Sequence, residues 1–365
     1  MSPRRTDSHR MVRGLSRRAL TRQLAALPLA LAGCAGPPPA ADAGRPWHHT
    51  ADGFRNPPGS PVRGGDFGDW SSFFWRGFAR DPAAVRVPEG HVLPSAETRA
   101  GLDGQNGADG ITWLGHASFL IRLDGITILT DPFLSDHASP VPPLGPARFA
   151  PPGLRADQLP PIDVMLLSHN HYDHLDLPTI DALPGKERIQ AIVPLRLGDY
   201  LSELGYSRVR ELDWGERASV DALTITSLPA IHFSKRSLFD RNRTLWAGYA
   251  IHGRRQRLHF AGDTAYGPAF SQLGPELQPF DLSLLPIGAY EPRELMRASH
   301  ATPEEAVRIG QDLRARRLVG MHWGSIQLTD EPPFEPPDRF LEAARKAGYG
   351  EDDAWILKIG ETRPI

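Results

Sequence analysis

Three features are missing from this 365-residue chain, and each absence excludes a class of protein. The only cysteine is Cys34, so no disulfide framework can form within the chain. No repeat with a period of about 20 to 50 residues is present, which excludes solenoids and propellers. Basic residues are not in excess, since 41 Lys and Arg stand against 43 Asp and Glu. Without a basic helix or a zinc-finger spacing either, we expect no nucleic-acid partner.

The N-terminal residues resemble an export signal rather than a membrane span. Seven arginines precede an apolar run over residues 24–32, which is too short to cross a bilayer. Residues 16–20 (SRRAL) resemble a twin-arginine signal. Residues 31–34 (LAGC) resemble a bacterial lipobox, in which Cys34 is lipidated and becomes the mature N-terminus. The Pro-rich residues that follow would then act as a tether.

The expected organisation therefore has three parts: an export signal at 1–33, a tether at 34–52 and one folded domain at 53–365. We expect the mature protein to be exported and lipid-anchored to a bacterial membrane that faces the periplasm or the cell exterior. Residues 1–33 hold seven arginines and one aspartate, so their removal leaves 34 basic against 42 acidic residues. A hydrophobic content of 40% and a charged content of 23% are ordinary for a soluble globular domain.

A dense polar motif follows an apolar run near the middle of the chain. Residues 162–167 (IDVMLL) predict a buried strand, and residues 168–176 (SHNHYDHLD) come directly after it, where loops commonly build sites. Four candidate metal ligands lie in this motif: His169, His171, Asp173 and His174. The first two are two residues apart, so they point the same way in an extended segment. Imidazole and carboxylate ligands together suit zinc or a similar transition metal, whereas a polar turn needs no such set.

Three further candidate ligands lie where other predicted strands end. They are His232 in LPAIHF, Asp263 in LHFAGD and His322 in LVGMHW. Each occupies the same kind of position as His169, although any one of them alone is more typical of a loop or a cap. Together with the first motif they make seven ligands, which is enough for two metal ions that share one carboxylate.

This ligand pattern resembles that of the metallo-β-lactamase superfamily. More narrowly, the chain is similar to the N-acyl-phosphatidylethanolamine-hydrolysing phospholipase D family from about Phe54 to near the C-terminus. The segments that carry the similarity are ITWLGHASFLI (111–121), LTDPFLSDHASP (129–140), PPIDVMLLSHNHYDHLD (160–176), FAGDTAYGPAF (260–270) and IGAYEPR (287–293). The chain departs from the family's pattern at its N-terminus and at Ser299, where an amide is expected.

The resemblance implies an αββα sandwich with two zinc ions at the edge of the sheets. It implies one zinc held by His169, His171 and His232, and a second held by Asp173, His174 and His322, with Asp263 bridging. Two such cations would lower the pKa of a bridging water and stabilise charge on the substrate, so no nucleophilic side chain is needed. We therefore interpret Ser168 only as a residue at the end of a strand.

Other polar residues are candidates for supporting roles. His116 and Asp131 are candidate partners of the ligating imidazoles, whose second N–H usually meets a carboxylate or carbonyl. For Asp131 the alternative is a turn-forming Asp-Pro pair. His300 is a candidate catalytic residue that would orient the substrate or move a proton. Tyr172 and residues 290–291 are weaker candidates for the pocket wall.

The apolar pattern also predicts the architecture. Strands are predicted at 111–114, 118–123, 126–130, 162–168, 191–194, 223–228, 247–252, 257–261, 282–286 and 318–321. Asp124-Gly125 predicts a tight hairpin turn between the second and third strands. Thr302-Pro303 starts a predicted helix that runs to about Arg316 and turns Ala306, Ile309 and Leu313 inward. Helices that alternate with strands favour two packed sheets covered by helices.

Five large aromatic residues lie within residues 70–78 (WSSFFWRGF). We expect them to pack on the sandwich as core, because large apolar side chains are rarely left exposed together. The alternative is an apolar lip at a bilayer surface that takes up acyl chains, with Phe74 and Trp75 as substrate-binding candidates.

The resemblance implies a metal-dependent phosphodiesterase of the phospholipase D type, which releases phosphatidic acid and an N-acylethanolamine from N-acyl-phosphatidylethanolamine. Its partners would be the phospholipid, a membrane surface reached through the anchor, and a second copy in a homodimer. A lactonase or sugar-phosphate hydrolase on the same fold is the alternative. A non-catalytic metal-binding surface protein is a third, which the complete ligand set disfavours. Fold analogy does not settle the substrate.

Overall fold

Two seven-stranded sheets form the centre of the protein, whose computed structural model describes residues 45–365. The first sheet has the order β14-β1-β2-β3-β4-β5-β6, with β1 Gly110–Gly115, β2 Ser118–Leu123, β3 Ile126–Thr130, β4 Val164–Leu166, β5 Gln190–Pro194, β6 Val209–Leu212 and β14 Thr362–Pro364. The second has the order β13-β12-β11-β10-β9-β8-β7, with β7 Arg217–Val220, β8 Leu223–Leu228, β9 Gly248–His252, β10 Arg257–Phe260, β11 Leu282–Pro286, β12 Leu318–Met321 and β13 Ala354–Trp355.

The two sheets share one pattern of strand direction. In the first, β1 to β3 are antiparallel and β3 to β6 are parallel. In the second, β7 to β10 are antiparallel and β10 to β13 are parallel. Strands β1, β3 and β4 therefore end at one edge of their sheet, and β8, β10 and β12 end at one edge of theirs. Loops that leave these edges can bring distant parts of the sequence together.

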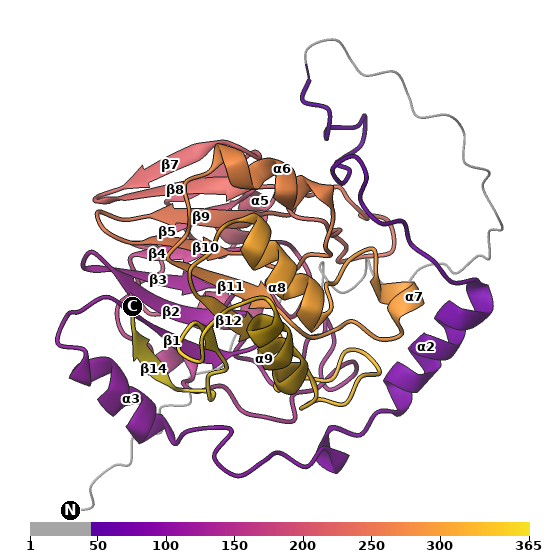
Figure 1. Cartoon of the computed structure of the whole chain (residues 1–365), viewed down its shortest axis with the longest axis horizontal. Coiled ribbons are helices and arrows are strands. Elements are labelled where there is room, and N and C mark those ends of the chain that lie inside the picture. The colour runs from indigo at the N-terminus through magenta and orange to yellow at the C-terminus, as the bar shows by residue number, and fades with distance from the viewer. Residues whose placement is uncertain (1–44) are drawn as a thin grey trace, which may run out of the picture. The chain divides into compact units, whose positions relative to one another are not determined.

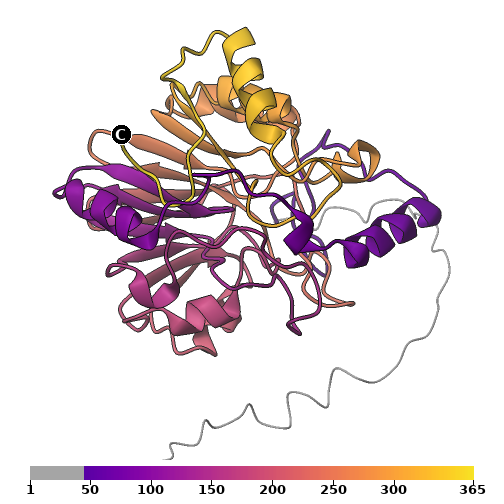
Figure 2. The ribbon, with the colours of Figure 1, turned by 90° about the horizontal axis from the view of Figure 1, so that it is seen from below.

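Several helices cover the outer faces of the two sheets, as Figures 1 and 2 show, whereas α2 (Phe67–Ala79) does not. The helices are α2 Phe67–Ala79, α3 Ser95–Gly104, α4 Leu177–Ala182, α5 Gly198–Ser202, α6 Pro268–Glu276, α7 Arg293–Met296, α8 Pro303–Asp312 and α9 Pro336–Lys346, with 3-10 turns at Pro82–Ala84 and Ala156–Gln158. Ile180 of α4 and Leu201 of α5 pack on the first sheet. Ile309 of α8 and Phe340 of α9 pack on the second.

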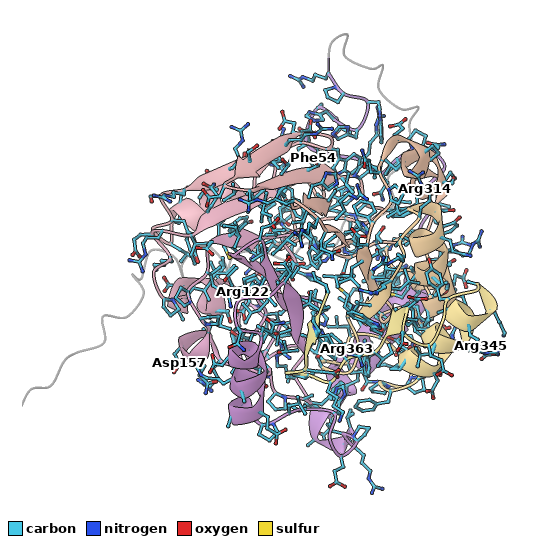
Figure 3. The ribbon with its side chains drawn as sticks, turned by 60° about the vertical axis from the view of Figure 1, so that its left-hand side comes forward. Phe54, Arg122, Asp157, Arg314, Arg345 and Arg363 are labelled. Carbon is cyan, nitrogen blue, oxygen red and sulfur yellow. The ribbon has the colours of Figure 1, made fainter. Side chains whose placement is uncertain are left out.

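Alternation along β2 shows how the layers are built. Phe119 and Ile121 belong to the core between the sheets, whereas Leu120 belongs to the core under α4 and α5. Opposite faces of one strand therefore serve two apolar layers. Side chains fill the space between the sheets, while Arg345 of α9 lies at the surface (Figure 3). Full burial of each large apolar side chain stabilises the fold by about 1.5–3 kcal/mol.

The predicted αββα sandwich is confirmed, and the differences from the predicted elements have local causes. The helix that begins at Thr302 has the predicted capping box and buries Ala306 and Ile309, but it ends at Asp312 because Arg314 adopts a left-handed φ of 56°. Strand β4 is shorter than predicted. Strands β6, β7, β13 and β14 were not predicted, because they are short and largely polar or irregular in pattern.

The N-terminal part of the described chain is more tightly held than a tether. Residues 45–365 form one unit, and within it His48 is buried, with its Nε2 2.6 Å from Asp213 Oδ1. Within the predicted tether at 34–52, His48 and His49 thus contact the folded domain, and residues 34–44 lie outside the described residues. The predicted export signal and Cys34 lie outside the described residues. Within residues 45–365, no helix is both long and apolar enough to cross a membrane.

Candidate metal centre and active site

Polar side chains that follow six strands meet at one edge of the sandwich. The strands of the first sheet supply His116 after β1, Asp131 after β3 and the motif that begins at Ser168 after β4. The second sheet supplies His232 after β8, Asp263 after β10 and His322 after β12. The structure thus brings all seven predicted ligands together from segments far apart in sequence.

His169, His171 and His232 form the first cluster. Nδ1 of His171 lies 2.8 Å from Nε2 of His169 and 3.2 Å from Nε2 of His232. Burial lowers the pKa of all three imidazoles, that of His171 to about 3 and that of His232 to about 4. The rings are therefore neutral near pH 7, which is the form that binds a transition metal.

Asp173, His174 and His322 form the second cluster, together with His116. Asp173 Oδ2 lies 2.9 Å from His116 Nε2, 3.5 Å from His174 Nε2 and 3.6 Å from His322 Nε2. We expected His116 to support a ligating imidazole from behind. It instead contacts the Asp173 carboxylate directly, and one of its ring nitrogens is within 4.8 Å of the other candidate ligand atoms.

Asp263 lies between the two clusters. Its Oδ2 is 3.2 Å from His174 Nε2 and 3.8 Å from His232 Nε2, while its Oδ1 is 3.2 Å from His322 Nε2. One buried carboxylate therefore faces both sets of imidazoles, as a bridging ligand would.

Unpaired buried atoms show that these residues fit a metal. Asp263 Oδ1 and Nε2 of His174 and of His322 have no hydrogen-bond partner among the described residues. Burial disfavours charge on Asp173 and Asp263, yet the neighbouring imidazoles hold the pKa of both carboxyls well below the usual range. These carboxylates in turn overcome burial and raise the pKa of His174. Positive charge is thus favoured where the unpaired atoms converge, which suits divalent transition metal ions.

A second layer of hydrogen bonds orients the imidazoles. Asp131 Oδ2 accepts from His174 Nδ1 at 2.7 Å and from Ser168 Oγ at 2.5 Å, and Asp131 Oδ1 accepts from Ser168 N at 2.7 Å. Ser168 Oγ also lies 2.8 Å from His169 Nδ1. Ser168 follows the end of β4, as interpreted from the sequence, and its hydroxyl in addition links Asp131 to an imidazole of the first cluster.

Strained backbone accompanies the site. His116, Asp131 and His322 all have positive φ, at 57°, 30° and 62°. Such conformations are uncommon for residues other than glycine and concentrate at functional sites. The two histidines are also joined through the main chain, because His322 N donates to His116 O at 3.0 Å.

Arg236 is a positioning residue that the sequence patterns did not reveal. Its Nη1 donates to the main-chain oxygens of Asn170 at 3.0 Å and Leu175 at 2.8 Å, and its guanidinium lies 3.9 Å from the ring centre of Tyr172. It therefore braces both ends of the ligand motif. The Tyr172 hydroxyl in turn donates to Arg236 O at 2.8 Å, and Tyr172 does not line the cavity, contrary to the weak prediction for the pocket wall.

A cavity of about 440 Å³ opens onto the clusters. At its inner end lie His171, Asp173, His232, Asp263 and His300. Its apolar lining includes Trp70, Phe73, Phe74, Leu295 and Met296. His300 Nδ1 lies 4.0 Å from Asp263 Oδ2 and has no hydrogen-bond partner among the described residues. Burial holds the pKa of His300 well below its usual range, so the imidazole is neutral.

Helix α2 contributes the aromatic wall but does not pack as core. It stands away from the two sheets, beside α7 (Figures 1 and 2), and Phe67 is 88%, Phe74 56% and Trp75 75% exposed. The favoured sequence interpretation, packing on the sandwich as core, therefore does not hold for Phe74 and Trp75, whereas Trp70 and Phe73 are partly buried. Of the two substrate-binding candidates, Phe74 lines the cavity and Trp75 does not.

Comparison with known proteins agrees with the fold. The profile of the beta-lactamase superfamily domain matches residues 127–323. An uncharacterised protein of Mycobacterium tuberculosis is 45% identical over 239 residues, which cover 64% of this chain and 63% of that protein, so the chain spans a little less than two thirds of that relative. N-acyl-phosphatidylethanolamine-hydrolyzing phospholipase D 1 of Caenorhabditis elegans is 40% identical over 243 residues, covering 63% of this chain and 68% of that protein. A metallo hydrolase of the archaeon Ignicoccus hospitalis shares the fold, with 22% identity, a TM-score of 0.53, and coverage of 71% of this chain and 98% of that one.

Two packed sheets, with imidazole and carboxylate groups converging at the ends of their strands, define a fold with a candidate metal centre at one edge. The chain belongs to the metallo-β-lactamase superfamily, and within it the chain is similar to the N-acyl-phosphatidylethanolamine-hydrolysing phospholipases D, as its sequence predicted. The individual roles of the site residues stay predictions.

Proposed function

We propose that the protein is a zinc-dependent phosphodiesterase, which hydrolyses N-acyl-phosphatidylethanolamine-type phospholipids to phosphatidic acid and N-acylethanolamine. The observation that carries the proposal is a cavity with an aromatic and aliphatic wall that opens onto two clusters of metal-binding side chains. A phosphodiester linked to long acyl chains needs both features. The similarity to the nematode phospholipase D supports the same substrate class.

The proposed arrangement uses two zinc ions per chain. His169, His171 and His232 would hold one ion, and Asp173, His174 and His322 the other, with Asp263 between them. Bound there, the cations would lower the pKa of water and stabilise negative charge on the phosphate oxygens. The contact from His116 Nε2 to Asp173 Oδ2 would fix the orientation of that carboxylate.

His300 is positioned to serve the leaving group. Hydrolysis breaks the bond between phosphorus and the ethanolamine oxygen, and that oxygen must gain a proton. A neutral imidazole that faces the cavity can take up the proton that the attacking water loses and pass it to that oxygen. The Nδ1 of His300 lies 4.0 Å from Asp263 Oδ2 and has no hydrogen-bond partner among the described residues. Arg293 Nη1 holds the His300 main-chain oxygen at 2.7 Å, which limits movement of the ring.

The acyl chains of the substrate would contact α2. A cavity of about 440 Å³ has room for a headgroup and the start of the chains but not for a whole three-chain lipid. The exposed Phe67, Phe74 and Trp75 would enter the surface of a bilayer, where tryptophan is favoured. Arg76 Nη2 and Arg80 both pair with Asp330, which fixes the helix at the mouth of the cavity.

We also propose export and a lipid anchor at Cys34, with homodimers at the membrane. An anchor would keep the α2 surface near lipid although the mature chain is acidic. The mass and membrane fractionation of a Cys34→Ser variant test this proposal, because an unchanged mass and distribution would exclude the anchor.

The substrate is tested with purified, metal-analysed enzyme and a panel of phospholipids, lactones and sugar phosphates. We expect N-acyl-phosphatidylethanolamine in mixed micelles to be hydrolysed in preference to the lactones and sugar phosphates, with phosphatidic acid as the identified product. A clear preference for a soluble lactone or a sugar phosphate would instead establish the alternative hydrolase on the same fold.

A further inference from the structure

Three basic residues stand at the open end of the cavity, opposite the buried carboxylates. Arg63, Lys235 and Arg241 line it and are exposed. Within residues 45–365, neither Arg63 nor Arg241 has a carboxylate within 4.0 Å, whereas other arginines near the cavity, such as Arg76 and Arg80, are paired with one. Their positive charge is therefore available to a ligand.

Aromatic rings hold both guanidinium groups in place. Arg63 lies 3.5 Å from the ring centre of Trp70, and Arg241 lies 4.2 Å from that of Phe233. Phe233 also contacts the His171 ring, with centroids 4.5 Å apart. A single aromatic side chain thus separates Arg241 from the first metal cluster. Stacked guanidinium groups leave their N–H edges free for planar or tetrahedral anions.

The two arginines also repel each other. Partial burial and the charge of Arg241 lower the pKa of Arg63, so the two groups interact electrostatically. Both remain charged at neutral pH, because an arginine side chain is protonated there. Two like charges in one cavity are unfavourable alone and favourable with an anion between them.

We propose that Arg63 and Arg241 bind a second anionic group of the substrate, a carboxylate or a phosphate, while its phosphodiester lies at the metal clusters. The enzyme would then prefer phosphodiester lipids whose headgroup carries an additional negative charge. This inference rests on the proposed phosphodiesterase function. The scissile phosphate itself does not need these arginines, since its charge is met at the buried end of the cavity.

The test uses two lipids with identical acyl chains, N-acyl-phosphatidylethanolamine and N-acyl-phosphatidylserine, which differ by one carboxylate. Each is presented at the same low mole fraction in nonionic micelles to enzyme of measured metal content. We expect kcat/KM to be about tenfold higher for the serine lipid, roughly the contribution of charge-assisted hydrogen bonds. The ratio should fall as salt is added. Phosphatidylglycerol and phosphatidylglycerol phosphate form a second pair, which differs by one phosphate instead of one carboxylate. A higher kcat/KM for the more negatively charged lipid in either pair supports the proposal.

Arg63→Gln with Arg241→Gln should bring the ratio of kcat/KM values close to one. The matched control, Arg210→Gln with Arg243→Gln, removes the same charge from exposed positions that do not line the cavity, and it should keep the ratio. Wild-type ratios near one in both pairs would overturn the inference, as would a preference that survives loss of both arginines. Adding an alkyl sulfate makes the micelles negatively charged. If this raised kcat/KM for the ethanolamine lipid to the value for the serine lipid, the preference would come from surface charge, and the inference would again be overturned. Hydrolysis of no lipid at full metal content would overturn the proposed function and this inference together.

Discussion

His174 Nδ1 and Asp131 Oδ2 are 2.7 Å apart and fully buried, so the carboxylate fixes which nitrogen of the imidazole faces the metal clusters. Asp131 also receives two hydrogen bonds from Ser168, whose hydroxyl reaches His169. One aspartate thereby couples the orientation of ligands in both clusters. Partners of this kind raise the basicity of a ligating imidazole and hold its ring.

Asp131→Asn should lower metal affinity about 10- to 100-fold, the range typical when such a partner is lost. The amide cannot supply the negative charge that stabilises the imidazole. Metal content after dialysis against graded chelator concentrations measures the change. Asp136→Asn, an exposed position in the same segment, is the control and should match wild type. Equal metal retention in both variants would show that Asp131 serves only the fold.

From the exposed aromatic residues of α2 we predict that their removal lowers turnover of long-chain substrate selectively. Phe74→Ala with Trp75→Ala should reduce turnover of long-chain substrate several-fold more than turnover of a short-chain soluble analogue, because only the former uses an apolar surface. Val141→Ala with Leu144→Ala removes exposed apolar area from another loop and should spare both substrates. Equal losses on long and short substrates, with metal content intact, would show that these aromatics do not meet the acyl chains.

We predict that burial of His259 causes part of the loss of folding stability at acidic pH. This residue is buried on β10 with Nδ1 2.7 Å from Ser283 Oγ, and burial lowers its pKa from 6.5 to about 3. Between these values the unfolded chain binds a proton that the folded chain does not. The stability contributed by the neutral ring is therefore complete above pH 6.5 and declines toward pH 3, by about 1.4 kcal/mol per pH unit.

His259→Asn should flatten the dependence of the unfolding free energy on pH by about that one-proton slope between pH 6 and 4. Urea unfolding at a series of pH values measures it. Ser283→Ala removes the hydrogen-bond partner but keeps the titrating group, so it should lower stability without removing the slope. An unchanged slope in His259→Asn would mean that the ring is protonated in the folded state.

Much of the sandwich and of the metal site could be predicted from the sequence, because both depend on the pattern of apolar strands. Apolar runs predicted the ten main strands, and residues such as His169 and Asp263 follow their ends, which meet at one edge when strands run parallel. Arg236 escaped notice because it acts through main-chain oxygens of Asn170 and Leu175, more than 60 positions away, and such contacts leave no side-chain pattern.

Two other residues show where pattern alone is insufficient. Ser168 looked like an ordinary strand end, since nothing local reveals that Asp131 and His169 converge on its hydroxyl. The aromatic residues of α2 looked like core because composition does not show whether a partner surface exists. The capping box between Asp66 and Asp69 was the available signal for a separate helix there.

The dinuclear phosphodiesterase is tested most directly at Asp263, whose carboxylate faces both clusters. Elemental analysis and hydrolysis of N-acyl-phosphatidylethanolamine are measured on the same preparations of wild type and Asp263→Ala. The wild type should hold about two zinc-like ions per chain and release phosphatidic acid, because a shared carboxylate suits a two-metal site. The variant should lose metal and hydrolysis together, with circular dichroism showing a folded chain. Full metal content and full activity in Asp263→Ala would contradict the two-metal site, and a metal-loaded wild type without activity on the lipid would contradict the phosphodiesterase.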